Sequence, residues 1–275
     1  MTPPRPFDPA LMPHYGWRSH GGAVIALIIA ITLYIAGIAL LDITPGRFLI
    51  GLFRLGDIIA LMLPPTPETW TRFFIYLDAL GQTLAIAFLG TLIAATLAIP
   101  LGFLAARNIV ANKIIHVLTR RGLDTVRSID ILIWALIWIN VVGLGPFAGM
   151  LAIASADLCA LAKLLSEAIE TADRRPVEGV MAAGGSRAEA IRFGIIPQIL
   201  PVFASQVLYY IESNTRSATI IGIVGAGGIG LYLSEQIRVL EWQQASFIIL
   251  MVLITVAIID TISRTLREAI IGKRR

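Results

Sequence analysis

Charged side chains are scarce in this sequence. Asp, Glu, Lys and Arg make up 15% of the residues, whereas a soluble domain carries roughly a quarter. Hydrophobic residues reach 57%, and the mean hydropathy is +0.81. These values exclude an ordinary soluble domain and indicate an integral membrane protein. The net charge of +4 comes from loop cations that favour anionic membrane lipid and gives no indication of nucleic acid binding.

Cysteine and histidine are nearly absent as well. The single cysteine, Cys159, excludes an internal disulfide, and the histidines His14, His20 and His116 lie too far apart to form a metal pattern with it. No G-x-x-x-x-G-K-[ST] phosphate-binding loop occurs. We therefore expect no enzyme, no metal and no cofactor in this chain, and ATP hydrolysis through such a loop must belong to another polypeptide.

Long apolar runs fill most of the chain. A helix spans a bilayer with about 18 or more apolar residues, and the GLGP segment at residues 143–146 divides one run into two helices. The sequence predicts an all-α, polytopic helical bundle with about six transmembrane helices. They are expected at residues 22–41, 76–104, 129–144, 147–166, 196–214 and 244–263.

The distribution of basic residues predicts the orientation in the membrane. With the N-terminus inside, the cytoplasmic segments hold 17 of the 22 Lys and Arg residues, as the positive-inside rule requires. Both termini should then lie in the cytoplasm. The cytoplasmic segments are residues 1–21, 105–128, 163–195 and 264–275.

Three regions follow from this reading. Residues 1–21 form a cytoplasmic tail, and residues 22–75 form an anchor helix followed by a segment at the outer surface. The apolar run of the anchor is too long for the core of a cleaved signal peptide. Residues 76–275 form the main membrane domain, with a polar loop at residues 167–195.

The most informative part of this polar loop runs from Glu178 to Pro197. Ser186 and Glu189 have the spacing of a capping box, so a second helix should begin just after the Gly184-Gly185 pair that ends the first. Small and apolar residues recur at helical spacing along the segment. Two short helices joined by a glycine hinge, with one apolar stripe, would form a docking surface.

This segment resembles the loop shared by the permease subunits of bacterial ABC importers, because Glu178, Gly184 and Pro197 have the spacing of its Glu, Gly and Pro. The segments GLGPFAG (143–149), KLLSEAIE (163–170), IPQILP (196–201) and ESNTRSATIIGIVGAGGIG (212–230) are similar to the phosphonate branch of that family. The resemblance implies a type I importer permease with a cytoplasmic coupling helix. It places ATPase coupling at Glu178, Gly184, Gly185, Ser186, Glu189, Ile191 and Pro197.

The resemblance also implies partners and cargo. A second permease copy or a paralogue would complete the path in the bacterial inner membrane. Two cytoplasmic ATP-binding subunits would carry ATP and Mg, and an external binding protein would deliver phosphonate, phosphite or hypophosphite. A methionine-type importer is the nearest alternative, because that family also has a VGAGG segment. A secondary carrier would need ionisable residues within several helices, and only Asp157 meets this requirement.

A polar cluster and a glycine cluster are the candidates for the translocation path or its gate. The polar residues could donate hydrogen bonds to an oxyanion, although Glu212 and Arg216 could equally form an i,i+4 ion pair. GAGGIG lacks the preceding strand of a dinucleotide site and should instead allow close backbone approach. For Asp157 we expect Lys163 or Arg216 as a structural partner. The path residues are Glu212, Ser213, Asn214, Arg216, Ser217, Thr219, Gly225, Gly227 and Gly228.

Overall fold

The computed structural model describes residues 21–41, 44–110 and 112–272, and its regular elements are all helices within these ranges. The chain divides into two compact units, residues 1–60 and 61–275. Gly21 begins the first helix, and the rest of the predicted tail at residues 1–21 lies outside the described residues. The all-α prediction is confirmed.

The first unit contains α1 (Gly21–Leu40) and nearly all of α2 (Pro45–Leu61). No residue of α1 is buried in the protein, and its mean hydropathy of 2.7 makes it a candidate membrane span. This helix coincides with the predicted anchor. The segment after the anchor forms the helix α2, whose apolar sequence is interrupted by the charged residues Arg47, Arg54 and Asp57.

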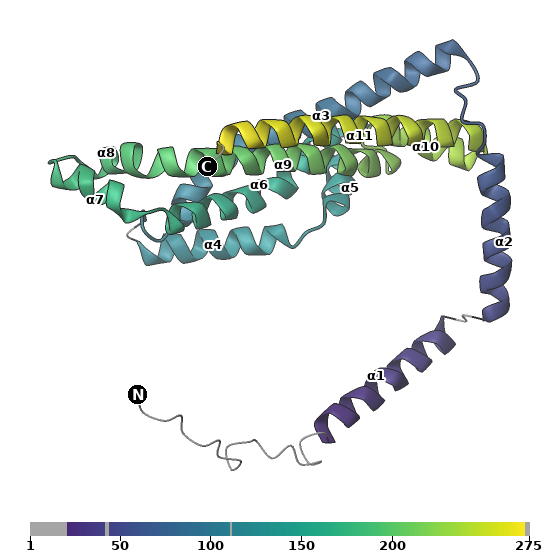
Figure 1. Ribbon diagram of the computed structural model, residues 1–275, viewed down its shortest axis with the longest axis horizontal. Coiled ribbons are helices and arrows are strands. Elements are labelled where there is room, and N and C mark those ends of the chain that lie inside the picture. The colour runs from purple at the N-terminus through teal and green to yellow at the C-terminus, as the bar shows by residue number, and fades with distance from the viewer. Residues whose placement is uncertain (1–20, 42–43, 111, 273–275) are drawn as a thin grey trace, which may run out of the picture. The chain divides into compact units, whose positions relative to one another are not determined.

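The second unit contains the remaining helices (Figure 1). The helix α9 packs along both α6 and α11, and α3 packs along α6. The elements α7 and α8 lie at one end of this body and α10 lies at the other. The bounds are α3 (Trp70–Ala105), α4 (Lys113–Arg127), α5 (Ile131–Val142), α6 (Pro146–Thr171), α7 (Arg174–Ala182), α8 (Arg187–Glu189), the π-helix η3 (Ala190–Ile195), α9 (Ile196–Ile223), α10 (Ile229–Arg238) and α11 (Trp242–Ile271).

Small residues set the distance between the two most closely packed helices. A Cβ atom added to Gly90 of α3 would lie 2.8 Å from Cβ of Ile153 in α6, and one added to Gly102 would lie 2.8 Å from Leu165 Cδ2. Close approach through small residues is the usual means of helix association in lipid. The single cysteine, Cys159, is buried in the same core, together with Ala94 and Ala98.

One predicted span differs from the structure. The helix expected at residues 129–144 is α5, which has 12 residues and is about 18 Å long at 1.5 Å per residue. A bilayer core is about 30 Å thick, so α5 cannot cross it alone. Five helices are long and apolar enough to span within the described residues, and the sixth candidate is the pair α4 and α5, bent by 89°. The predicted cytoplasmic segment at residues 105–128 therefore contains a helix of this broken pair.

Candidate functional site

The segment from Glu178 to Pro197 contains the predicted capping box. The Glu189 carboxylate accepts a hydrogen bond of 2.7 Å from the backbone N–H of Ser186, and the backbone N–H of Glu189 donates to Ser186 Oγ at 3.3 Å. Gly184 has a φ of +85°, a left-handed conformation that favours glycine. A tight turn therefore separates α7 from α8, as the sequence predicted.

The second helix of this segment is not short. After the single turn of α8 the chain continues as the π-helix η3 and then directly as α9, with Pro197 in the first turn of α9. The prediction of two short helices is thus wrong for the second one. No residue between Glu189 and Pro197 breaks the helical path, so the turn at Gly184 leads into a membrane helix.

Close packing against α7 leaves no room for a side chain at Gly194. A Cβ atom there would lie 2.9 Å from Val177 Cγ2 and 3.0 Å from Val177 Cα, because α7 packs against η3 at this point. Gly185 approaches α7 in the same way, with its added Cβ 2.7 Å from Val180 Cγ1. These two close contacts hold α7 against Gly185 and η3, so the segment folds back on itself as a hairpin.

Polar contacts tie the start of α7 to α9 and the start of α8 to the loop after α3. Gln198 at the start of α9 accepts from the Asp173 N–H at 2.9 Å and donates to the Asp173 carbonyl at 3.1 Å. Arg187 Nη2 donates to the carbonyl of Ile109 at 3.2 Å, just beyond α3. Glu178 and Met181 remain exposed on α7, whereas Ile191 packs partly against the buried cluster of Ile195 and Ile199.

A polar cavity of about 380 Å³ lies where the junction of α4 and α5 meets α6 and α9. It contains three of the predicted path residues, Ser213, Asn214 and Ser217. It also contains residues that the sequence analysis did not assign to a path, on the junction, on α6 and, in the case of Tyr210, on α9. These are Arg127, Ser128, Asp130, Asp157 and Tyr210, with Ile129, Ile131, Ala156 and Ala160.

The carboxylates of this cavity have polar partners. Asn214 Nδ2 donates to Asp157 Oδ2 and, at 2.8 Å, to Thr91 Oγ1. Asp130 caps α5 by accepting from the Leu132 N–H at 2.8 Å. The expectation that Lys163 or Arg216 would pair with Asp157 is wrong: Lys163 pairs with Asp124 instead. The actual partner, Asn214, lies 57 positions from Asp157 on another helix, and the packing of α9 against α6 selects it over the neighbouring Arg216.

The remaining predicted path residues of α9 lie outside this cavity. Glu212 is buried and forms an ion pair of 2.8 Å with Arg267 of α11, while the predicted pair with Arg216 has a longer N–O distance of 3.9 Å. The Arg216 side chain is half exposed. Thr219 is buried and donates to the Thr215 carbonyl within α9. None of these three lines the polar cavity.

The glycine cluster lies in the turn between α9 and α10, where Gly225, Gly227 and Gly228 all have positive φ. A Cβ atom on Gly227 would lie 2.6 Å from the backbone N of Pro146, and the Gly145 N–H donates to the Gly225 carbonyl at 3.1 Å. Thr83 Oγ1 accepts from the Ile229 N–H at 2.8 Å. The turn thus packs backbone against backbone on the GLGP segment. A helix, not a strand, precedes it, which excludes a dinucleotide fingerprint.

The tight packing at this turn predicts the effect of Gly149→Ala. A Cβ atom on Gly149 would lie 2.6 Å from the Ala226 carbonyl oxygen, whereas one on Gly122 would meet nothing within 4 Å. Gly149→Ala should lower the free energy of unfolding by about 1–3 kcal/mol through overpacking. Gly122→Ala, the matched control on α4, should not lower it. Thermal midpoints of the purified variants test this, and equal midpoints would contradict the packing described.

Sequence comparison relates the chain to membrane transport proteins. Residues 98–275 match the family described as "Binding-protein-dependent transport system inner membrane component". The chain is 38% identical to the phosphite transport permease protein HtxC of Stutzerimonas stutzeri, over 82% of this chain and 79% of that protein. It is 32% identical to the phosphite transport system permease protein PtxC of the same organism, over 92% of this chain and 90% of that protein.

Structure comparison agrees at the level of the fold. An inward-facing structure of the MetNI methionine ABC transporter superposes with a TM-score of 0.64 at 18% identity, covering 74% of this chain and 99% of that one. An amino acid ABC transporter superposes with a TM-score of 0.61 at 15% identity, covering 72% of this chain and 95% of that one. The type I importer permease fold is therefore confirmed. The chain belongs to the family of inner membrane components of binding-protein-dependent transport systems, and is a multi-pass ABC permease.

Proposed function

We propose that this chain is the permease subunit of an importer for phosphite, phosphonate or a related reduced phosphorus oxyanion such as hypophosphite. The polar cavity between the α4–α5 junction, α6 and α9 carries the proposal. Relatives that align over most of their length with this chain are named for phosphite transport. A permease of the methionine type is the alternative. The structural likeness of this chain to a methionine transporter is at 18% identity and concerns the fold alone.

The chemistry of the cavity suits a small oxyanion in transit. Ser128, Ser213 and Ser217 line the cavity with hydroxyl groups, and Arg127 adds positive charge. The hydroxyls of Ser128 and Ser217 donate to the carbonyls of Thr125 and Ser213, so they would turn toward the cargo to bind it. Asn214 donates a hydrogen bond to the Asp157 carboxylate. This bond offsets part of the repulsion between that carboxylate and an anion. With few donors in a cavity of about 380 Å³, the cargo would be bound weakly. Weak binding favours release, so selectivity would reside in the separate binding protein.

The assembly follows from the same proposal. Two copies of the chain, or one copy and a paralogue, would form the path, and an external binding protein would deliver the cargo. Two ATPase subunits, which hold the ATP and Mg, would dock in the cytoplasm on the segment from Glu178 to Pro197. Both termini would then be cytoplasmic. The glycine turn at Gly225–Gly228 would close the outer end of the path through its backbone packing.

The test is phosphite uptake by cells that lack other phosphite importers and express this chain with its ATPase and binding protein. Ser213→Ala with Ser217→Ala should lower the uptake rate by at least about tenfold, since even one hydrogen bond to a charged group contributes about 1.5–3 kcal/mol and about 1.4 kcal/mol is a factor of ten. Ser234→Ala on α10, outside the cavity, is the control. Phosphonate and hypophosphite should compete with phosphite, and methionine should not. Methionine uptake without phosphite uptake would favour the alternative, and transport without the ATPase would indicate a secondary carrier.

A further inference from the structure

A second cavity lies at the other end of α4, away from the junction with α5. It has a volume of about 510 Å³ and is lined by Arg107, Val110, Lys113, His116 and Val117. Arg107 comes from the loop after α3, and Lys113 and His116 come from the first turns of α4. The two cations and the imidazole thus surround one space.

The imidazole of His116 has an unused hydrogen-bond donor. Its Nε2 lies 3.3 Å from Arg107 Nε, and because an arginine can only donate, Nε2 must accept. The proton of the neutral ring is then on Nδ1. This atom has no hydrogen-bond partner among the described residues, and His116 is buried, with 6% of its surface exposed. A buried donor without an acceptor is unusual in proteins. Because His116 lines the cavity, a turn of its ring would bring this donor to an oxyanion held there.

The cations beside His116 are not neutralised by the nearest carboxylates. Glu170 accepts from the backbone N–H of Arg107, but its ion pair is with Arg120 at 3.1 Å. Asp124 pairs with Lys163. Lys113 and Arg121 have no ion pair among the described residues. The positive charge on this face of α4 therefore remains available.

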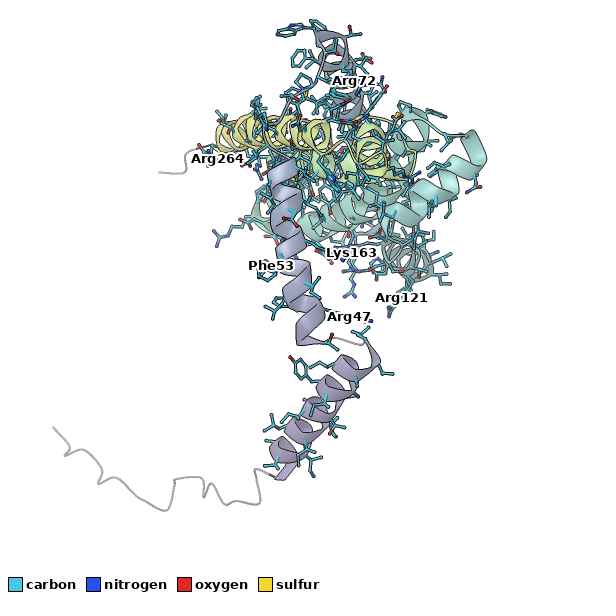
Figure 2. All side chains as sticks on the ribbon, turned by 90° about the vertical axis from the view of Figure 1, so that its right-hand side faces the viewer. Arg47, Phe53, Arg72, Arg121, Lys163 and Arg264 are labelled. Carbon is cyan, nitrogen blue, oxygen red and sulfur yellow. The ribbon has the colours of Figure 1, made fainter. Side chains whose placement is uncertain are left out.

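An apolar trough continues from this cavity. A neighbouring space of about 450 Å³ is lined by Lys113, Ile114, Val117, Leu118 and Arg121, and so shares Lys113 and Val117 with the first. Ile114 and Leu118 are 76% and 73% exposed. Figure 2 shows Arg121 on the side of α4 turned away from the other helices of its unit. Charged donors beside exposed aliphatic side chains match a molecule with an anionic head and an acyl chain.

We propose that Arg107, Lys113 and His116 bind the phosphate of an anionic membrane lipid, whose acyl chain lies along Ile114 and Leu118. The same donors would accept a free phosphorus oxyanion, but the apolar trough favours the lipid. The site is separate from the polar cavity, and it does not depend on the cargo proposed above.

The experiment uses the permease complex purified with its ATPase, in nanodiscs of phosphatidylcholine with or without phosphatidylglycerol. We expect phosphatidylglycerol to raise the thermal midpoint and to remain bound in native mass spectra. Arg107→Gln with Lys113→Gln should weaken lipid binding on the order of 30-fold, because each basic residue near an anionic surface contributes a factor of about five. His116→Leu keeps both cations and should weaken binding by roughly fivefold through loss of one donor.

The controls distinguish this site from general attraction and from free phosphate. Arg238→Gln with Arg264→Gln removes the same charge from α10 and α11 and should leave lipid binding unchanged. Lys113→Gln alone alters an exposed side chain and serves if the double variant does not fold. Equal binding of phosphatidylglycerol by the wild type and Lys113→Gln would overturn the proposal. Stabilisation of detergent-solubilised complex by inorganic phosphate alone would also overturn it, in favour of a free-anion site.

Discussion

Glu178→Arg combined with Met181→Asp should abolish uptake while the permease remains folded in the membrane. Both side chains are exposed on α7, so the substitutions leave no buried group without a partner. If the ATPase docks here, a reversed charge and a charge in place of an apolar contact should weaken docking on the order of 100-fold, the effect of losing an interface hot spot. The measurement is copurification of the ATPase with the tagged permease, together with cargo uptake.

The matched control for this result is Glu235→Arg. Glu235 is exposed on α10, at the end of the unit opposite α7 (Figure 1), and it should leave ATPase copurification unchanged. Gly184→Pro tests the turn between α7 and α8 independently. Proline cannot adopt the φ of +85° found there, so this variant should also lose ATPase copurification. Full ATPase copurification with Glu178→Arg/Met181→Asp would contradict the assignment of docking to this segment.

Arg267→Met should be the most destabilising single change that preserves side-chain length. Arg267 is the close cationic partner of Glu212, whose side chain is 9% exposed, and Arg216 is 3.9 Å away on the other side. Removing one member of a buried ion pair costs about 3–5 kcal/mol because the other charge stays buried. Because Arg216 stays 3.9 Å from Glu212, the free energy of unfolding, measured by denaturant titration of the purified protein, should fall by no more than that amount.

A double variant separates this cause from lost packing. Glu212→Leu with Arg267→Met removes both charges and should recover most of the stability, as replacement of buried pairs by apolar residues often does. Arg264→Met, one turn earlier on an exposed part of α11, should change little. If the double variant is as unstable as Arg267→Met, the loss comes from the stacking of the Arg267 guanidinium over the Tyr209 ring, with Cζ 6.0 Å from the ring centroid.

Local patterns were the predictable part of this fold. The capping box at Ser186 and Glu189 involves residues three positions apart, and the turn at Gly184 needs a conformation that glycine adopts freely. Such features depend on a few neighbouring residues. They could therefore be identified from the sequence before any tertiary contact was known.

Tertiary pairing was not predictable in the same way. The i,i+4 spacing of Glu212 and Arg216 indicated a pair, yet the shorter contact comes from Arg267, 55 positions away. Asp157 likewise is bound by Asn214 from another helix. The polar residues at 127–130 had a visible signal, since they separate an amphipathic helix from an apolar one, but only packing against α6 and α9 makes them part of a cavity.

The continuity of η3 with α9 has a mechanical consequence. A π-helix and Pro201, which lacks the N–H for an intrahelical bond, both lie before the cavity residues Ser213 and Ser217. Bending is easiest at such interruptions. The stretch from Ser213 to Ile223 contains neither, so it must turn as a single body. Motion that passes the bends at η3 and Pro201 therefore reaches Ser213 and Ser217 together, and the two serines cannot be reoriented independently.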